Sequence, residues 1–368
     1  MKNKDKLIKI TVYAAALAVT VASAFSFTDE MLGIGAELAL LSLQMMLPFS
    51  EEGSEQLTTA EKPTESEKIT EAAQTVMKTE SFTATPKDIE SLIKKAEKTA
   101  VKDKKGGSIR EKQYKNEGVT DKYALVRMKN VNKTQVSIKD ILNEKIDLSV
   151  SKNKPSVLIF HTHTTETYQI LDRDFYSENF KTRTNNKGEN MVRVGEAIAE
   201  EIEKAGFGVI HDKEIYDTKY TGAYSKSRAG IEKILKENPS VQIVLDIHRD
   251  AISDSDGTKV KPVATVKGKK AAQIMLVSGC QEEGNSITNL PDWRYNLTFA
   301  VHLQQKLEEL FEGITRPLYF CPRSYNMNVS HCSLLVEVGS DSNTLEEAVY
   351  TGKCIGTALS EILEEYEE

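Results

Sequence analysis

The feature that most constrains the fold is an alternation of short apolar runs with helical patterns, from about residue 120 to residue 368. Short apolar runs of this kind predict buried strands, and apolar residues spaced three and four apart predict helices. Strands that alternate with helices predict an α/β fold with a mostly parallel sheet and flanking helices. Strands are expected at 123–128, 156–160, 208–210, 243–246, 274–277 and 334–338, and helices at 189–205, 223–237, 295–312 and 344–365.

The beginning of the chain has a different composition. Lysines precede a mostly apolar run at 8–27, which is typical of a signal sequence or signal anchor. We favour an uncleaved transmembrane anchor over 1–30, and cleavage near Ala22-Ser23-Ala24 is the alternative. A broken apolar stretch at 31–50 predicts a juxtamembrane segment at the membrane interface. Because positive flanks stay inside, the rest of the chain is expected outside the cytoplasm, on a single-pass membrane protein.

Residues 51–119 are rich in charge and poor in large apolar side chains, which predicts a flexible linker with a transient helix near 86–99. The remaining segment, 120–368, is then a single α/β catalytic domain. The chain carries 48 Lys and Arg against 55 Asp and Glu, a net charge of -7. This acidic balance argues against nucleic acid as a partner.

The four cysteines all lie in the C-terminal half of the chain, at positions 280, 321, 332 and 354. In an exported protein an even number permits disulfides, and Cys321 with Cys332 is the most plausible pair. Buried free thiols are an equally good interpretation. No Cys-x-x-Cys motif is present, which argues against a structural zinc site.

Three of the expected strands end in residues that bind metals or move protons. His161, His163 and Glu166 follow the first, His248 ends the second, and Glu337 ends the third. The carboxyl ends of parallel strands meet at one edge of a sheet, so these groups are expected to converge. A catalytic zinc takes three His or carboxylate ligands and keeps one open position. A carboxylate in an apolar strand is costly unless it is paired, protonated or functional, so Glu337 is expected to act as a general base.

Each of these groups also has a simpler structural explanation. A His-x-His pair is often incidental, and Asp246-Ile-His-Arg-Asp250 is also compatible with a salt-bridge cluster that closes a loop. His211 is expected beside the site or in a loop, and His302 on an amphipathic helix. His331, just before the last strand, is more compatible with the surface than with a substrate contact.

Four motifs together carry a family resemblance. They are His-Thr-His-Thr-Thr-Glu-Thr-Tyr at 161–168, Asn-Met-Val-Arg-Val-Gly-Glu at 190–196, Asp-Ile-His-Arg-Asp at 246–250 and Leu-Val-Glu-Val-Gly-Ser-Asp-Ser-Asn at 335–343. Over about residues 120–368, these motifs resemble the stage II sporulation protein P family. The resemblance also includes the N-terminal anchor and the charged linker. More distantly, the last motif looks like that of the zinc-dependent N-acetylmuramoyl-L-alanine amidases.

This resemblance implies a cell-wall hydrolase of endospore-forming bacteria. The family cuts peptidoglycan as an N-acetylmuramoyl-L-alanine amidase and as an endopeptidase during engulfment. It works from the mother-cell membrane, facing the forespore, with stage II sporulation proteins D and M as partners. The implied cofactor is Zn²⁺.

Matching by position gives His163 and His248 as the first metal ligands. The remaining ligand stays open among Glu166, His161 and Glu189, in that order, and Glu337 matches the catalytic glutamate of the amidases. The residues expected to contact sugar or peptide are Arg249, Tyr168, Asn328 and Arg228, with Tyr220 and Tyr224 as weaker candidates.

Two other functions are compatible with the same residues. One is an amidohydrolase-like enzyme, a β/α barrel whose metal site uses His161, His163, His211, His248 and Asp250. The other is a non-catalytic, membrane-anchored scaffold that binds peptidoglycan. The barrel needs eight βα units, and only five or six clear strands are visible.

Overall fold

The structure, a computed structural model, describes residues 79–100, 102–282 and 289–368. The predicted anchor at 1–30 and the juxtamembrane segment at 31–50 lie outside these residues. Across the described ranges, no helix combines the length and apolar character needed to cross a membrane.

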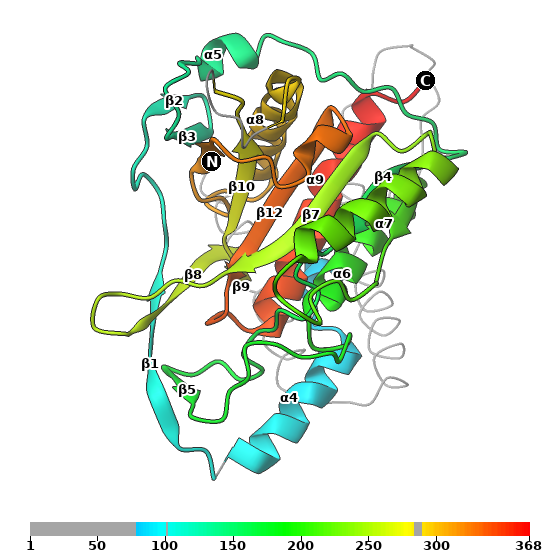
Figure 1. Ribbon diagram of the computed structural model, residues 1–368. Coiled ribbons are helices and arrows are strands. Elements are labelled where there is room, and N and C mark those ends of the chain that lie inside the picture. The colour runs from blue at the N-terminus through cyan, green and yellow to red at the C-terminus, as the bar shows by residue number, and fades with distance from the viewer. Residues whose placement is uncertain (1–78, 101, 283–288) are drawn as a thin grey trace, which may run out of the picture. The chain divides into compact units, whose positions relative to one another are not determined.

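A mixed eight-stranded sheet forms the centre of the described chain (Figure 1). Only two neighbouring pairs in it are antiparallel, β2 with β3 and β10 with β12. The predicted α/β fold with a mostly parallel sheet is therefore confirmed. The sheet is open, with β2 and β6 at its edges, so the β/α barrel is wrong. In spatial order its strands are β2 (Asp121–Tyr123), β3 (Val126–Asn130), β11 (Leu318–Cys321), β10 (Ile274–Gly279), β12 (Cys332–Ser340), β7 (Ile243–Asp250), β4 (Pro155–Phe160) and β6 (Gly208–His211).

The two faces of the sheet are covered unequally. Successive strand residues point to opposite faces, so Val157 and Ile159 pack in the large core while Leu158 packs with Ile231 in a smaller one. In Figure 1, α8 and α9 lie behind β10 and β12, whereas α7 lies in front of β4. The helices of the large core are α6 (Met191–Lys204), α8 (Trp293–Leu310) and α9 (Leu345–Glu365), and α7 (Ala223–Glu237) belongs to the smaller core.

The long helices begin where the sequence carries capping residues. The Asn190 side chain accepts a hydrogen bond from the Val192 N–H at the start of α6. Thr344 and Glu347 form a capping box at the start of α9. The strand expected at 123–128 is instead a hairpin of β2 and β3, which turns at Ala124 with φ 51°.

The folded region begins well before residue 120. Helix α4 (Lys87–Ala100) and strand β1 (Lys105–Lys112) lie within the predicted flexible linker. Ile89 is 1% exposed, and Arg193 Nε donates to Asp88 Oδ2 at 2.7 Å. The few apolar residues of this segment lie on one face and are buried only against the rest of the fold, which local composition does not reveal.

Strand β1 also builds a second sheet, of order β5-β1-β8-β9, which the sequence analysis did not predict. The other strands are β5 (Phe175–Ser177), β8 (Lys259–Val266) and β9 (Lys269–Ala272). The remaining short elements are helix α5 (Ile138–Ile141) and the 3₁₀ turn η1 (Met327–Val329).

All four cysteines are buried and free. The disulfide between Cys321 and Cys332 is absent from this structure, which has the free-thiol arrangement instead. The Cys332 Sγ donates to the Asp147 carbonyl at 3.7 Å.

Candidate active site

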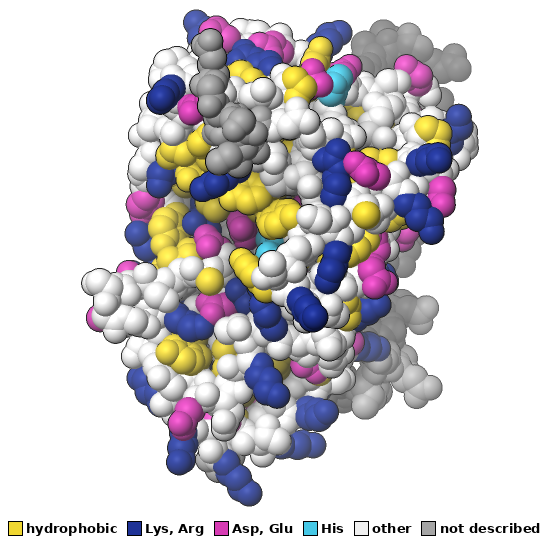
Figure 2. All heavy atoms as spheres, in the orientation of Figure 1, with side chains coloured by type: hydrophobic (Ala, Val, Ile, Leu, Met, Phe, Trp, Pro, Cys, Tyr) yellow, Lys and Arg dark blue, Asp and Glu magenta, His cyan; other side chains and the backbone are white. Residues whose placement is uncertain are grey.

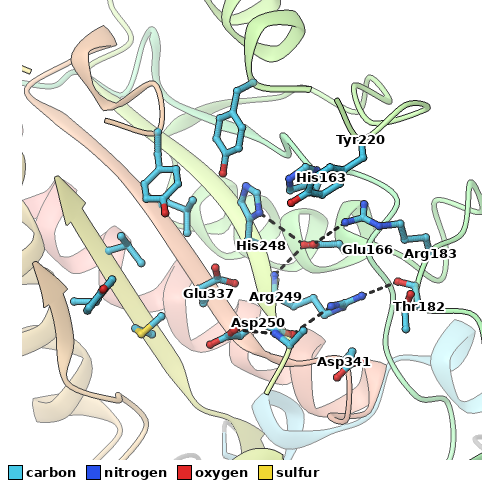
Figure 3. A pocket seen from close by; sticks show the side chains of 17 residues that line it. His163, Glu166, Thr182, Arg183, Tyr220, His248, Arg249, Asp250, Glu337 and Asp341 are labelled. Carbon is cyan, nitrogen blue, oxygen red and sulfur yellow. Dashed lines mark hydrogen bonds and ion pairs between the residues drawn. The ribbon is translucent and has the colours of Figure 1, made fainter. Parts of the chain in front are cut away.

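A cavity of about 520 Å³ lies on the face of the sheet that carries α7, near the carboxyl ends of β4, β7 and β12. Figure 3 shows labelled side chains from all three regions facing it. Figure 2 shows a histidine and an acidic side chain at the centre of this surface, with hydrophobic side chains around them. The predicted site residues that line the cavity are His163, Glu166, His248, Arg249 and Glu337, together with the weaker candidates Tyr220 and Tyr224.

Glu337 is held in the middle strand of the cavity floor. In β12 it lies opposite His248 of β7 and opposite Met275 of β10. Its Oε2 atom is buried and has no hydrogen-bond partner among the described residues. Burial raises the pKa of this carboxyl to about 8. Near neutral pH, Glu337 can therefore both take up and release a proton.

His248 lies between two carboxylates. Its Nε2 atom is 2.8 Å from Asp246 Oδ1, in an orientation that does not make a hydrogen bond, and its Nδ1 atom is 3.7 Å from Glu166 Oε2. Burial alone would lower the pKa of His248, but the charges of Asp246 and Glu166 outweigh it and raise the pKa to about 9. This position therefore favours a positive charge.

Glu166 is fixed by neighbours on both sides of the cavity. It accepts hydrogen bonds from the Arg249 N–H at 3.3 Å and from Arg183 Nη2 at 3.3 Å. Burial raises the pKa of its carboxyl. Its backbone N–H donates to the His163 carbonyl at 3.0 Å, so the two residues belong to one tight turn after β4.

The His163 ring forms the wall of the cavity opposite Glu337. It stacks on Tyr220 with ring centroids 4.7 Å apart and lies nearly perpendicular to the His248 ring at 5.4 Å. Its Nδ1 atom is buried 3.8 Å from Asp217 Oδ2 and has no hydrogen-bond partner within the described ranges. Burial lowers the pKa of His163 to about 4, so the ring is neutral near pH 7 and able to bind a metal.

His161 is not brought to the cavity. Its Nδ1 atom is 3.0 Å from the Ile247 carbonyl, and its Nε2 atom is 2.9 Å from His211 Nε2. Both ring nitrogens are thus used beside Gly195 of α6, in the large core. Strand β4 ends at Phe160 and the chain turns, so His161 and His163 do not share the face that a continued strand would give them.

Glu189 and Tyr168 also lie away from the cavity. Glu189 is half-buried before α6, where its Oε1 accepts from Asn186 Nδ2 at 2.7 Å. Tyr168 is 1% exposed, and its hydroxyl donates to the Val338 carbonyl at 2.9 Å. Tyr168 therefore packs the core rather than facing a ligand.

The three remaining predicted substrate contacts have partners within the protein. Arg228 donates to Asn328 Oδ1, and its Nε also donates to Glu232 at 2.6 Å. Arg249 lines the cavity, but its guanidinium donates to the carbonyls of Thr167 and Thr182, at 2.8 and 2.6 Å. Arg249 thus holds the loops that form the cavity wall.

Several site residues escaped the sequence analysis. Asp217 is buried in a loop, where it accepts hydrogen bonds from the Thr165 N–H at 3.1 Å and from Arg183. No motif surrounds Asp217 or Arg183, so no sequence signal pointed to them. Asp246 belongs to a motif that the sequence analysis placed at the site, with a salt-bridge cluster as the alternative, but its position beside His248 was not predicted.

His163, Glu166 and His248 line one cavity and are of the residue types that bind zinc, although their ligand atoms do not all lie within 4.8 Å of one another. His248 Nδ1 and Glu166 Oε2 are 3.7 Å apart, near the roughly 3.3 Å that separates two ligand atoms of a tetrahedral zinc. The carboxylates of Asp246 and Glu166 favour a positive charge at His248, and a bound metal ion would take the place of the ring proton there. Asp246 beside His248 resembles the carboxylate that orients a zinc-bound histidine.

An acidic cluster elsewhere does not compete with this site. Glu111, Asp172 and Glu347 are the one group of possible ligands in the described chain whose atoms all lie within 4.8 Å of one another. Lys261 Nζ lies 2.6 Å from Asp172 and 2.6 Å from Glu347, so its ammonium group supplies the positive charge.

The fold and this cavity define an α/β protein with a histidine–carboxylate centre. The profile of the family "Stage II sporulation protein P (SpoIIP)" matches residues 40–360. The chain therefore belongs to the stage II sporulation protein P family, as the motifs predicted.

A curated relative of this chain is stage II sporulation protein P of Bacillus subtilis (strain 168). The two are 27% identical over 222 residues, which is 57% of this chain and 51% of the relative. The match thus spans about half the length of that curated relative.

Two solved structures illustrate the similarity in three dimensions. N-acetylmuramoyl-L-alanine amidase AmiC2 of Nostoc punctiforme is 10% identical with a TM-score of 0.33, and the match covers 59% of this chain and 98% of that one. The CwlD amidase of Clostridioides difficile, in complex with the GerS lipoprotein, is 13% identical with a TM-score of 0.33, covering 56% and 99%. These scores are too low to carry an argument about shared activity.

Proposed function

We propose that this chain is a peptidoglycan hydrolase of sporulation, a zinc-dependent N-acetylmuramoyl-L-alanine amidase with endopeptidase activity. The observation that carries the proposal is Glu337, a carboxylate with an unpartnered buried oxygen, opposite His248 in a cavity that also holds His163 and Glu166. Membership of the stage II sporulation protein P family supports the cell-wall role.

In this proposal His163, Glu166 and His248 hold the zinc ion. Zinc bound there supplies a Lewis acid for the amide carbonyl and lowers the pKa of water. Asp246 and Asp217 lie behind the two histidines and limit how their rings can turn.

Glu337 performs the proton transfers. Its carboxylate takes a proton from the attacking water and returns it to the nitrogen that leaves. A pKa of about 8 for Glu337 suits both steps, because it lies close to neutral pH and both the charged and the protonated carboxyl are accessible there. Arg249 keeps the cavity wall in place through its carbonyl contacts, and the Tyr220 ring over His163 shields one side from water.

We also propose that the chain acts in engulfment, anchored in the mother-cell membrane and facing the forespore. The apolar segment at 8–27 supports the anchor, and family membership supports stage II sporulation proteins D and M as partners. Co-purification from sporulating cells tests both partners. Recovery of neither would remove them from the proposal.

One experiment tests the activity. The full chain would be purified and incubated with cell-wall sacculi, with added zinc or with a chelator, and the products read by mass spectrometry. Release of intact stem peptides supports the amidase, and split cross-links support the endopeptidase. If sacculi bind the chain but yield no product under any metal condition, the non-catalytic scaffold is the better function.

A further inference from the structure

A side pocket of about 220 Å³ adjoins the main cavity. The two spaces share the side chains of Tyr224 and Tyr325 as lining. The rest of the side pocket is formed by Arg323, Ser324 and Asn326. A substrate in the main cavity would therefore reach the side pocket across these two tyrosines.

The loop that carries Tyr325 has an unusual backbone. Tyr325 and Asn326 have φ of 41° and 58°, in the left-handed region that residues other than glycine rarely adopt. Asn326 Nδ2 donates to the Tyr224 carbonyl at 3.0 Å and to Ser227 Oγ at 3.3 Å, which ties the loop to α7. Backbone strain of this kind clusters at ligand-binding sites.

The tied loop completes a row of aromatic rings. The Tyr325 and Tyr224 ring centroids are 5.7 Å apart, and the Tyr224 ring lies nearly parallel to His248 at 6.4 Å. The row therefore runs from the proposed metal ligands to the side pocket. Such flat, partly apolar walls suit the aliphatic and amide portions of a peptide.

Arg323 lines the same side pocket as Tyr224 and Tyr325. It is exposed, and no carboxylate of the described chain lies within ion-pair distance of its guanidinium. Two neighbouring arginines already form ion pairs within the protein: Arg183 pairs with Glu166, and Arg316 pairs with Asp250. Arg323 is thus a planar cation that remains available to an anionic ligand.

We propose that the side pocket is a subsite for the carboxylate-bearing peptide of the substrate. Arg323 pairs with a peptide carboxylate, and Tyr224 and Tyr325 pack against the chain between that carboxylate and the amide to be cut. The subsite deepens the proposed function and rests on it. It selects an acidic peptide over a neutral one.

Binding to the full chain carrying Glu337→Gln tests the subsite without turnover. Calorimetry would compare a muropeptide whose peptide carboxylates are free with the same compound carrying carboxamides. We expect the free acid to bind about 5- to 10-fold more tightly. Adding Arg323→Gln should remove this preference, and Arg323→Lys should retain part of it.

Arg110→Gln is the matched control, because Arg110 pairs with Asp254 and lines none of these spaces. It should leave the preference unchanged. Melting temperatures would confirm that each variant is folded. Equal binding of acid and amide, no binding of either, or a preference that survives Arg323→Gln would overturn the subsite. Failure of the hydrolase function is a separate observation, the absence of products when the unsubstituted chain meets sacculi.

Discussion

His248 and Glu337 lie directly opposite each other in the adjacent parallel strands β7 and β12. Register partners in parallel strands point to the same face of the sheet, so a basic ring and a carboxyl meet at the cavity floor without any loop to position them. Their charges are coupled, because the His248 charge partly offsets the effect of burial on the Glu337 pKa. In the proposed function the two residues have separate roles, with His248 as a metal ligand and Glu337 as the group that moves the proton.

Glu337→Gln should lower the rate of stem-peptide release by at least about 10²-fold, because the amide cannot accept the water proton. Zinc content, measured by atomic absorption, should stay near that of the unsubstituted chain. Glu189→Gln is the control, since Glu189 lies outside the cavity, and it should keep its rate. A near-normal rate in Glu337→Gln would remove Glu337 from the mechanism.

His248→Ala should lower the zinc bound per chain, because it removes one of the three proposed ligands. His331, which is half-exposed and lies outside the main cavity, provides a matched control, and His331→Ala should keep full zinc content. Unchanged zinc in His248→Ala would mean that the metal is bound elsewhere.

Adding zinc to metal-free chain should raise its melting temperature, since a ligand that binds only the folded state stabilises it. The gain is about 2.7 kcal/mol when free zinc exceeds its dissociation constant 100-fold. Scanning fluorimetry over a zinc titration measures the shift, and a chelator should reverse it. The shift should be much smaller in His163→Ala. Equal shifts in both proteins would contradict the assignment of His163.

The attachment of α4 should depend on acid pH. The hydrogen bond from Arg193 lowers the pKa of Asp88 below its usual value of 3.8. A carboxyl with a lowered pKa stabilises the fold above its unfolded pKa, and that contribution disappears as the pH falls through the folded pKa. Asp88→Asn should therefore lower the melting temperature at pH 7, and the difference from the unsubstituted chain should shrink below about pH 4. A difference that is constant from pH 7 to pH 3 would contradict this role.

Lys261→Met should destabilise the fold by about 3 kcal/mol, because it leaves the buried Glu347 carboxylate without its cation. Urea unfolding measures the change. Lys270→Met is the control, since Lys270 contacts the same acidic cluster from a half-exposed position, and it should cost much less. Similar losses in the two variants would show that the burial of Lys261 does not matter.

Much of the main sheet and its helices follows from local patterns. The helix expected at 223–237 has those bounds in the structure, and the others differ by at most two residues at either end. Apolar periodicity is a local property of the sequence, so it predicts the elements whose own residues form a clear apolar face. Strand β1 was not predicted, and the helix predicted near 86–99 was expected to be transient, because the burial of both depends on partners far away, such as β8 and Arg193.

The sequence by itself determined the α/β class, the family and the three motifs that supply the site. Only the tertiary structure decided which members of those motifs meet. The turn after Phe160 sends His161 into the large core beside His211 and leaves His163 at the cavity. Likewise, strand register places Glu337 against His248, while Asp217 approaches His163 from a loop without any motif. A motif lists the available side chains, but the direction of each depends on where a strand ends and which strand lies next to it.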